Sequence, residues 1–247
     1  MVHRYRLDCL MWQRQSQHSM QARLVAHRGG EAIGGGDLLE AARRLVELRI
    51  EMVEVDVRRT RDGELVIHHD ETVRGGALQD RSYGELSQAE TRISRLEDFL
   101  DIVAGHMAVN IELKEPGYEA QALSASLARI EPDNLVVTSF SEAAVATAKQ
   151  LATEVSAGLL VGRREPLAAL LRDVFPFGRL QACRADFLAP HYRLLATGIG
   201  RRAERRGIGL LVWTVNDSRL IDRYLRDPRV LGVVTDAIVP AHRRSEV

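Results

Sequence analysis

The sequence predicts an α/β fold, specifically a (β/α)8 TIM barrel with a β-hairpin decoration after the second strand. Short apolar strands alternate with helical segments from residue 23 onward, a pattern typical of parallel strands joined by helical crossovers. Eight such units remain once one hairpin is set aside, and eight units close a barrel. The chain length of 247 residues suits one such domain. An open doubly wound sheet is the alternative, but H-R-G-G lacks the spacing of a dinucleotide-binding turn.

The expected strands are short apolar runs, and several of them end in polar residues. They cover 23–27, 52–56, 108–113, 135–139, 157–161, 186–189, 209–214 and 230–235. The expected helices carry apolar residues at helical spacing. They cover 38–48, with Asp37 as N-cap, and then 94–104, 118–130, 142–151, 166–174, 193–206 and 218–225. Residues 74–91 are expected to form a polar, irregular excursion.

The stretch 52–70 places acidic side chains on one face of an apolar strand. Side chains alternate along a strand, so Glu54 and Asp56 share one face, and the valines between them share the other. The turn at 60–63 sends the chain back through 64–69 as an antiparallel arm. An antiparallel arm cannot be the next parallel strand, so it is expected to decorate the second strand of the barrel.

Composition excludes several classes of protein. Apolar residues make up 45% and charged residues 28%, and the formal net charge is zero, so no general attraction to nucleic acid is expected. No apolar run is long enough to span a membrane, so no integral membrane association is expected. Cys9 and Cys183 form no disulfide framework, which suits a reducing, cytoplasmic compartment.

The expected domain covers residues 23–247. Residues 1–22 are expected to be a loosely attached arm that is either disordered or upstream of the true start, since Met20 offers a second start site.

Three acids on the expected strands predict a metal site. Buried carboxylates are costly unless they are paired or bind a cation. Glu54, Asp56 and Glu112 offer three oxygen donors without sulfur, a set that favours Mg²⁺ or Ca²⁺ over zinc. Surface exposure, or pairing with basic residues such as Lys114, is the competing interpretation.

Two histidines and two cations follow the same strand ends. His27 and His69 are the expected proton carriers, because imidazole titrates near neutral pH. Arg28 offers a planar fork for phosphate, and Lys114 offers a point charge. Together with a divalent metal, these residues suit cleavage of a phosphodiester, in which the cations stabilise the charge of the transition state.

The order of these motifs resembles that of the glycerophosphodiester phosphodiesterase family, barrel enzymes related to phosphatidylinositol phospholipase C. The matching segments are V-A-H-R-G, E-V-D-V-R-R-T-R-D-G-E-L-V-I-H-H-D, N-I-E-L-K, T-S-F, V-W-T-V-N and G-V-V-T-D. The resemblance runs from residue 23 to about 240, and the block at 54–70 is its most specific part.

The resemblance implies a metal-dependent enzyme acting on a small-molecule phosphodiester, with glycerol 3-phosphate as a product. It implies a role for each matched residue. The metal ligands are Glu54, Asp56 and Glu112; the catalytic histidines are His27 and His69; Arg28 binds phosphate; Lys114 is the active-site lysine; and Trp213 lies near the substrate. Barrel packing is the alternative for Trp213. The oligomeric state is not predicted.

Two departures from the family pattern lie beside the expected site. The family's P-E-N-T stretch is replaced here by Gly35-Gly36-Asp37-Leu38, and the R-T-T stretch after the H-D pair is missing. Two alternative functions therefore stay open. One is a phospholipase D-like lyase that acts on a lysophospholipid or sphingolipid and releases a cyclic phosphate. The other is a barrel that binds a phosphodiester without turning it over.

Overall fold

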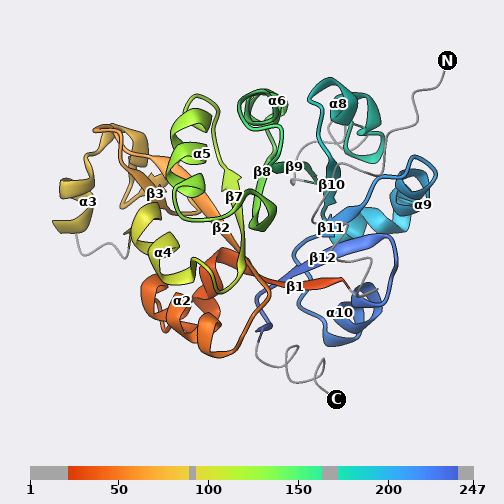
Figure 1. Cartoon of the computed structure of the whole chain (residues 1–247), viewed down its shortest axis with the longest axis horizontal. Coiled ribbons are helices and arrows are strands. Elements are labelled where there is room, and N and C mark those ends of the chain that lie inside the picture. Colours follow the sequence, from red (N-terminus) through yellow and green to blue (C-terminus); the bar gives the residue numbers. More distant parts are fainter. Residues whose placement is uncertain (1–21, 89–92, 163–171, 239–247) are drawn as a thin grey trace.

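The computed structural model describes residues 22–88, 93–162 and 172–238. Eight parallel strands form the barrel, and helices surround them (Figure 1). The strands are β1 (Arg23–Ala26), β2 (Met52–Arg59), β7 (Ala108–Leu113), β8 (Leu135–Ser139), β9 (Ser156–Val161), β10 (Phe187–Pro190), β11 (Leu210–Val212) and β12 (Val230–Thr235). The described helices between them are α2 (Leu38–Glu47), α4 (Leu96–Val103), α5 (Glu119–Leu127), α6 (Glu142–Leu151), α8 (Phe177–Ala182), α9 (Ile199–Glu204) and α10 (Ser218–Leu225).

The first strand closes the barrel. β1 pairs in parallel with β2, where Val25 faces Met52, and with β12, where Ala26 faces Thr235. Every barrel strand therefore has two neighbours, and the sheet has no open edge within the barrel. The predicted TIM barrel is confirmed, and the doubly wound sheet is wrong.

Strand alternation divides the core into two layers. Val53, Val55 and Val57 of β2 point outward and pack in the large cluster between strands and helices. Met52 points inward and packs in the smaller cluster inside the barrel. Glu54 and Asp56 follow Met52 on the same inward face, so the strand places both acids inside the barrel above its apolar floor.

The hairpin decoration is confirmed and is larger than the sequence suggested. β2 continues to Arg59, and β3 (Leu65–Ile67) returns antiparallel to it. β6 (Ser94–Arg95) adds a further antiparallel strand on β3. The segment expected to be irregular, 74–91, is structured over its described residues, 74–88. β5 (Gly76–Ala77) pairs with the preceding β4 (Thr72–Val73), and a 3₁₀ turn (Leu78–Asp80) and α3 (Tyr83–Gln88) follow; α3 lies outside the ring of helices (Figure 1).

Two expectations in the C-terminal half need correction. The single helix expected at 193–206 is broken into a 3₁₀ helix (Tyr192–Thr197) and α9, because Gly198 takes a left-handed conformation with φ +78°. A Gly at such a position ends a helix readily. The helix α8 was not predicted, and most of the helix expected at 166–174 falls outside the described residues.

The expected arm at 1–22 lies outside the described residues except for Ala22, whose N–H donates to Leu225 O. Within the described ranges, no helix is both long and apolar enough to cross a membrane.

Candidate active site

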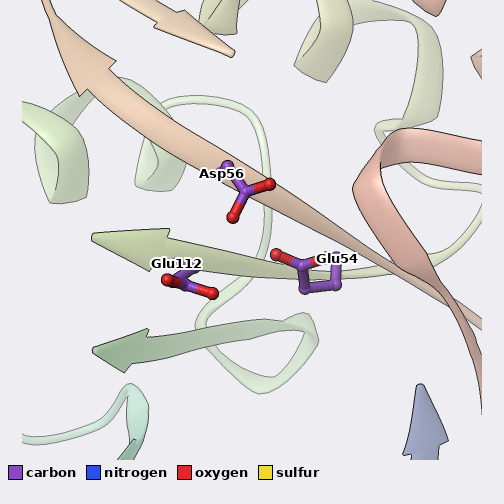
Figure 2. A group of neighbouring side chains, drawn as sticks. All are labelled: Glu54, Asp56 and Glu112. Carbon is purple, nitrogen blue, oxygen red and sulfur yellow. The ribbon is translucent and has the colours of Figure 1, made fainter. Parts of the chain in front are cut away.

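Three carboxylates meet at the C-terminal end of the barrel, where enzymes of this fold carry their chemistry. Glu54 and Asp56 come from β2 and Glu112 from the neighbouring β7, in which it faces Asp56 across the ladder (Figure 2). One oxygen from each lies within 4.8 Å of the others. Glu54 is 4% exposed and Asp56 2% exposed, so neither acid is a solvated surface residue.

Burial and mutual repulsion dominate the electrostatics of this cluster. Desolvation and the nearby Asp56 charge raise the pKa of Glu54 to about 8. Desolvation also raises the pKa of Glu112, although the Lys114 ammonium opposes it. The Lys114 Nζ donates to Asp56 Oδ1 at 2.9 Å and to Glu112 Oε1 at 2.8 Å. One lysine thus balances part of the charge of three acids.

The remaining carboxylate oxygens fit a cation. Glu54 Oε1 and Asp56 Oδ2 are buried and find no hydrogen-bond donor within the described ranges. Buried polar atoms without a partner are rare in native proteins and indicate an ion or ligand. The donor set of carboxylate oxygens suits a hard divalent cation such as Mg²⁺ or Ca²⁺.

The glycine-rich turn after β1 delivers His27 and Arg28 to the same cluster. Arg28, Gly29 and Gly30 all have positive φ, and the turn brings the Arg28 N–H within 2.9 Å of Glu54 Oε2. Gly29 has φ +64°, and an added Cβ would lie 2.3 Å from Leu38 Cδ1, so the backbone conformation and the close packing both favour glycine. The Arg28 side chain lies with its Nε 3.8 Å from Asp56 Oδ2.

His27 is held by Asp236, which follows β12, and Asp236 is held in turn by Asn216, which follows β11. Its Nδ1 lies 2.6 Å from Asp236 Oδ1, and Asn216 Nδ2 donates to Asp236 Oδ2 at 2.7 Å. Burial disfavours the charged imidazole, but the hydrogen bond to Asp236 and the Glu54 charge outweigh it and raise the pKa of His27. The other nitrogen, Nε2, faces Glu54 Oε2 at 4.0 Å.

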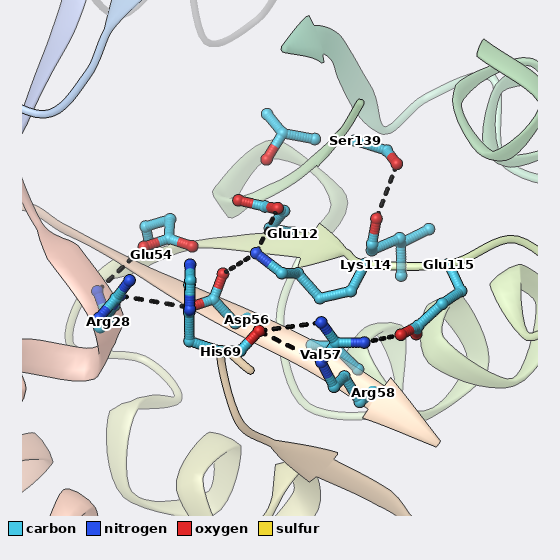
Figure 3. A network of polar contacts seen from close by, with 12 residues as sticks. Arg28, Glu54, Asp56, Val57, Arg58, His69, Glu112, Lys114, Glu115 and Ser139 are labelled. Atoms are coloured by element: carbon cyan, nitrogen blue, oxygen red, sulfur yellow. Dashed lines mark hydrogen bonds and ion pairs between the residues drawn. The ribbon is translucent and has the colours of Figure 1, made fainter. Parts of the chain in front are cut away.

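His69 reaches the cluster from the end of the hairpin. Its Nδ1 lies 2.8 Å from Asp70 Oδ1, and its carbonyl oxygen accepts two N–H groups of Arg58 (Figure 3). Burial lowers the pKa of His69, against the effect of the Asp70 hydrogen bond. The site therefore holds one histidine with a raised pKa and one with a lowered pKa, each oriented by a carboxylate through Nδ1.

The three acids, both histidines, Arg28 and Lys114 line one pocket of about 860 Å³. The part of the lining contributed by the second half of the chain carries two charged residues, Asp173 and Arg193, beside a group of apolar and aromatic residues: Phe140, Leu160, His191, Leu194, Leu211 and Trp213. The Trp213 ring stands edge-on to Phe140 and His191, and its Nε1 donates to Ala189 O at 2.7 Å. Trp213 therefore both faces the pocket and packs on the strand ends, so the two alternatives for this residue are compatible.

The structure brings every predicted site residue into this pocket: His27, Arg28, Glu54, Asp56, His69, Glu112, Lys114 and Trp213. Sequence reasoning assigned no role to Asp236, Asn216, Asp70 or Arg58. Asp236 and Asn216 stand in the polar endings T-D and V-N of the last two strands, so their position at the barrel mouth was visible, but the contact of Asp236 with His27 was not.

Comparison with known proteins agrees with this geometry. Residues 27–239 match the model of the glycerophosphoryl diester phosphodiesterase family. A glycerophosphodiester phosphodiesterase of Caldanaerobacter subterraneus is 26% identical, over 88% of this chain and 95% of that protein. The structure resembles a Thermotoga maritima glycerophosphodiester phosphodiesterase (TM-score 0.71, 25% identity, 91% and 97% of the two chains). It also resembles an Oleispira antarctica phosphodiesterase in complex with the product sn-glycerol-3-phosphate (TM-score 0.74, 22% identity, 93% and 99%).

Proposed function

Because the chain belongs to the glycerophosphoryl diester phosphodiesterase family, we propose that it hydrolyses glycerophosphodiesters to an alcohol and glycerol 3-phosphate. One observation carries the proposal: three neighbouring carboxylates share a pocket with two histidines oriented by carboxylates, and the two buried acids, Glu54 and Asp56, each have an oxygen that accepts no hydrogen bond from the described part of the chain. The product bound to the Oleispira antarctica relative supports the choice of reaction.

Glu54, Asp56 and Glu112 would hold a divalent metal, Mg²⁺ or Ca²⁺. When bound, the ion supplies Lewis-acid polarisation of the phosphoryl group and neutralises charge in the transition state. Arg28 and Lys114 add fixed positive charge beside the acids, where the phosphate of the substrate would lie. The group of apolar and aromatic residues that includes Trp213 would receive an organic group of the substrate.

The two histidines would carry the protons of the reaction. In hydrolysis, one imidazole takes a proton from the attacking water as the new P–O bond forms. The other imidazole protonates the alkoxide that leaves as the old P–O bond breaks. His27, held by Asp236, and His69, held by Asp70, are each fixed through Nδ1, which leaves Nε2 of each ring for this exchange.

The test is release of glycerol 3-phosphate from glycerophosphocholine and glycerophosphoethanolamine with Mg²⁺, Ca²⁺ or chelator. We expect release that depends on metal, and phosphorus NMR should show a phosphomonoester product. If the product is a cyclic phosphate, the enzyme is a lyase and not a hydrolase. If there is no turnover with any metal, the result favours a barrel that binds a phosphodiester without cleaving it.

Two variants with matched controls test the roles of the residues. Glu54→Ala and His69→Ala should each reduce turnover by several orders of magnitude. The controls are Asp98→Ala, an exposed acid on α4, and His106→Ala, an exposed histidine before β7; both should retain wild-type turnover. Turnover retained by both Glu54→Ala and His69→Ala would contradict the mechanism.

A further inference from the structure

His69 lies just beyond the regular part of its hairpin. β3 ends at Ile67, which faces Val57 in the ladder, and the His68 N–H still donates to Asp56 O at 2.9 Å. Strand pairing stops there, so the ladder does not fix the His69 peptide. A proton-transfer group must nevertheless be held within a fraction of an ångström of its working position.

The Arg58 side chain supplies the missing anchor. Arg58 follows Glu54 and Asp56 on the inward face of β2 and is 8% exposed. Its Nε and Nη2 lie 3.3 Å and 2.9 Å from the His69 carbonyl oxygen, so one guanidinium donates two hydrogen bonds to this oxygen (Figure 3).

Arg58 is itself fixed from the opposite side. Its Nη1 forms an ion pair with Glu115, which follows the active-site Lys114 in the loop after β7. The Tyr118 hydroxyl lies 3.0 Å from Glu115 Oε2 and 2.6 Å from Val57 O, and Tyr118 is 4% exposed. The chain of contacts therefore links the segment just after β3 to the loop after β7 through the end of β2.

We propose that Arg58 is a positioning residue that sets the place of the His69 imidazole, and that Glu115 holds Arg58 for this task. This inference rests on the proposed function, in which His69 transfers a proton. The hydrogen bonds and the ion pair of Arg58 described above go to His69 O and Glu115, so its guanidinium is engaged by the protein and acts on the reaction through His69.

The geometry requires an arginine at this position. A guanidinium presents several N–H donors in one rigid plane, so it can meet a carbonyl with two donors and a carboxylate with a third. A lysine ammonium is a single point on a flexible stem and cannot reach both partners in the same way. Arg58→Lys therefore keeps the positive charge and removes the simultaneous contacts with the His69 carbonyl oxygen and Glu115.

The experiment compares Arg58→Lys with Arg59→Lys in the full chain. Arg59 is the next residue of β2; it is exposed and donates to Gly117 O on the outside of the barrel. Turnover of glycerophosphocholine is measured with the metal that supports the wild-type enzyme. We expect Arg58→Lys to lower kcat by about 10- to 100-fold with KM within about threefold of wild type, as for loss of an orienting contact. Arg59→Lys should match wild type, and Glu115→Gln should lower kcat by a smaller factor.

A double-mutant cycle separates this inference from the proposed function. His69→Ala alone tests the role of His69. If that variant is impaired, the double variant Arg58→Lys/His69→Ala should be no slower than His69→Ala, because Arg58 then has no imidazole to position. Full additivity, or a raised KM with unchanged kcat, would overturn the inference and make Arg58 a direct substrate contact.

Thermal unfolding of each variant shows whether it is folded at the assay temperature. If Arg58→Lys unfolds below the assay temperature, Arg58→Gln takes its place, because its amide keeps one N–H donor for the same carbonyl. The same kcat loss and the same non-additivity are then expected. Wild-type kcat in a folded Arg58 variant, together with an impaired His69→Ala, would overturn the positioning role and leave the proposed function intact.

Discussion

The metal-free protein should become more stable when Glu54 is replaced by glutamine, although Glu54 is buried. In the absence of metal, three carboxylates share one site, and Lys114 balances only part of their charge. Desolvation, together with the charge of Asp56, raises the pKa of Glu54 to about 8 from an ordinary value of 4.5. Ionisation of Glu54 therefore works against the folded state.

The sign and size of the effect follow from linkage. A carboxyl with a raised pKa binds more protons in the folded state, so its contribution to stability is complete below pH 4.5 and is lost as the pH rises through about 8. The gap between these values, at about 1.4 kcal/mol per pH unit, sets a ceiling of about 5 kcal/mol. Glutamine does not titrate, so Glu54→Gln escapes this loss. Its amide oxygen can still accept the Arg28 N–H that Glu54 accepts.

The assay is thermal unfolding with EDTA at pH 6 and pH 8. The melting temperature of Glu54→Gln minus that of wild type should be larger at pH 8 than at pH 6 by several degrees. This follows because about 1 kcal/mol of stability corresponds to about 2–4 °C for a chain of this size. The control Glu131→Gln alters an exposed glutamate before the turn at Pro132–Asn134 and should show no such change. Mg²⁺ or Ca²⁺ should stabilise wild type more than Glu54→Gln. A difference between Glu54→Gln and wild type that is the same at both pH values would refute the reasoning.

Two further substitutions test the positioning of His27 and the packing of the barrel. Asp236→Asn should lower kcat by about 10- to 100-fold and move the pH–rate limb of His27 to lower pH, because the partner that raises its pKa loses its charge; a pH–rate profile checks both effects. Gly158→Ala should destabilise the fold by about 1–3 kcal/mol in urea unfolding, since its Cβ would lie 2.2 Å from the Phe187 ring. Gly178→Ala, with open space around its Cβ, should not, and an equal loss in both would contradict this explanation.

The strand order and the shared face of the acids could be predicted because they depend on local regularities. Alternation along 52–56 places Glu54 and Asp56 together whatever lies next to the strand. Parallel neighbours then bring Glu112 opposite Asp56, since both stand near the carboxyl ends of their strands. These features need only the period of the strand and the direction of its neighbours.

The contacts that orient the histidines depend on information that local pattern does not carry. His27 and Asp236 are 209 residues apart, and they meet because barrel closure sets Ala26 opposite Thr235. A closed barrel places its last strand beside its first, so the T-D ending was a usable signal. The hydrogen bonds from Arg58 to the His69 carbonyl oxygen depend on how one peptide group beyond the end of β3 is oriented. The alternation of residues along a strand does not specify that orientation.

The expected helix at 193–206 failed for a different reason. Its apolar spacing is helical, but Gly198 interrupts it with a positive φ, so the segment continues as a separate helix. Glycine in a helical pattern is a recognised stop signal, so the sequence did contain the sign of this break, in Gly198 and not in the apolar spacing.

The departure in the glycine-rich loop is accommodated without disturbing the position of His27 and Arg28 after β1. Asp37, which stands where the family has asparagine, accepts the N–H groups of Leu39 and Glu40 and so caps α2. Gly36, which stands where the family has glutamate, has φ +89°, a conformation that strongly favours glycine. Upstream, the Arg28 N–H remains bound to Glu54 at 2.9 Å, independently of either residue. The exchange of these two residues in the loop therefore leaves the three acids and both histidines in place around the pocket.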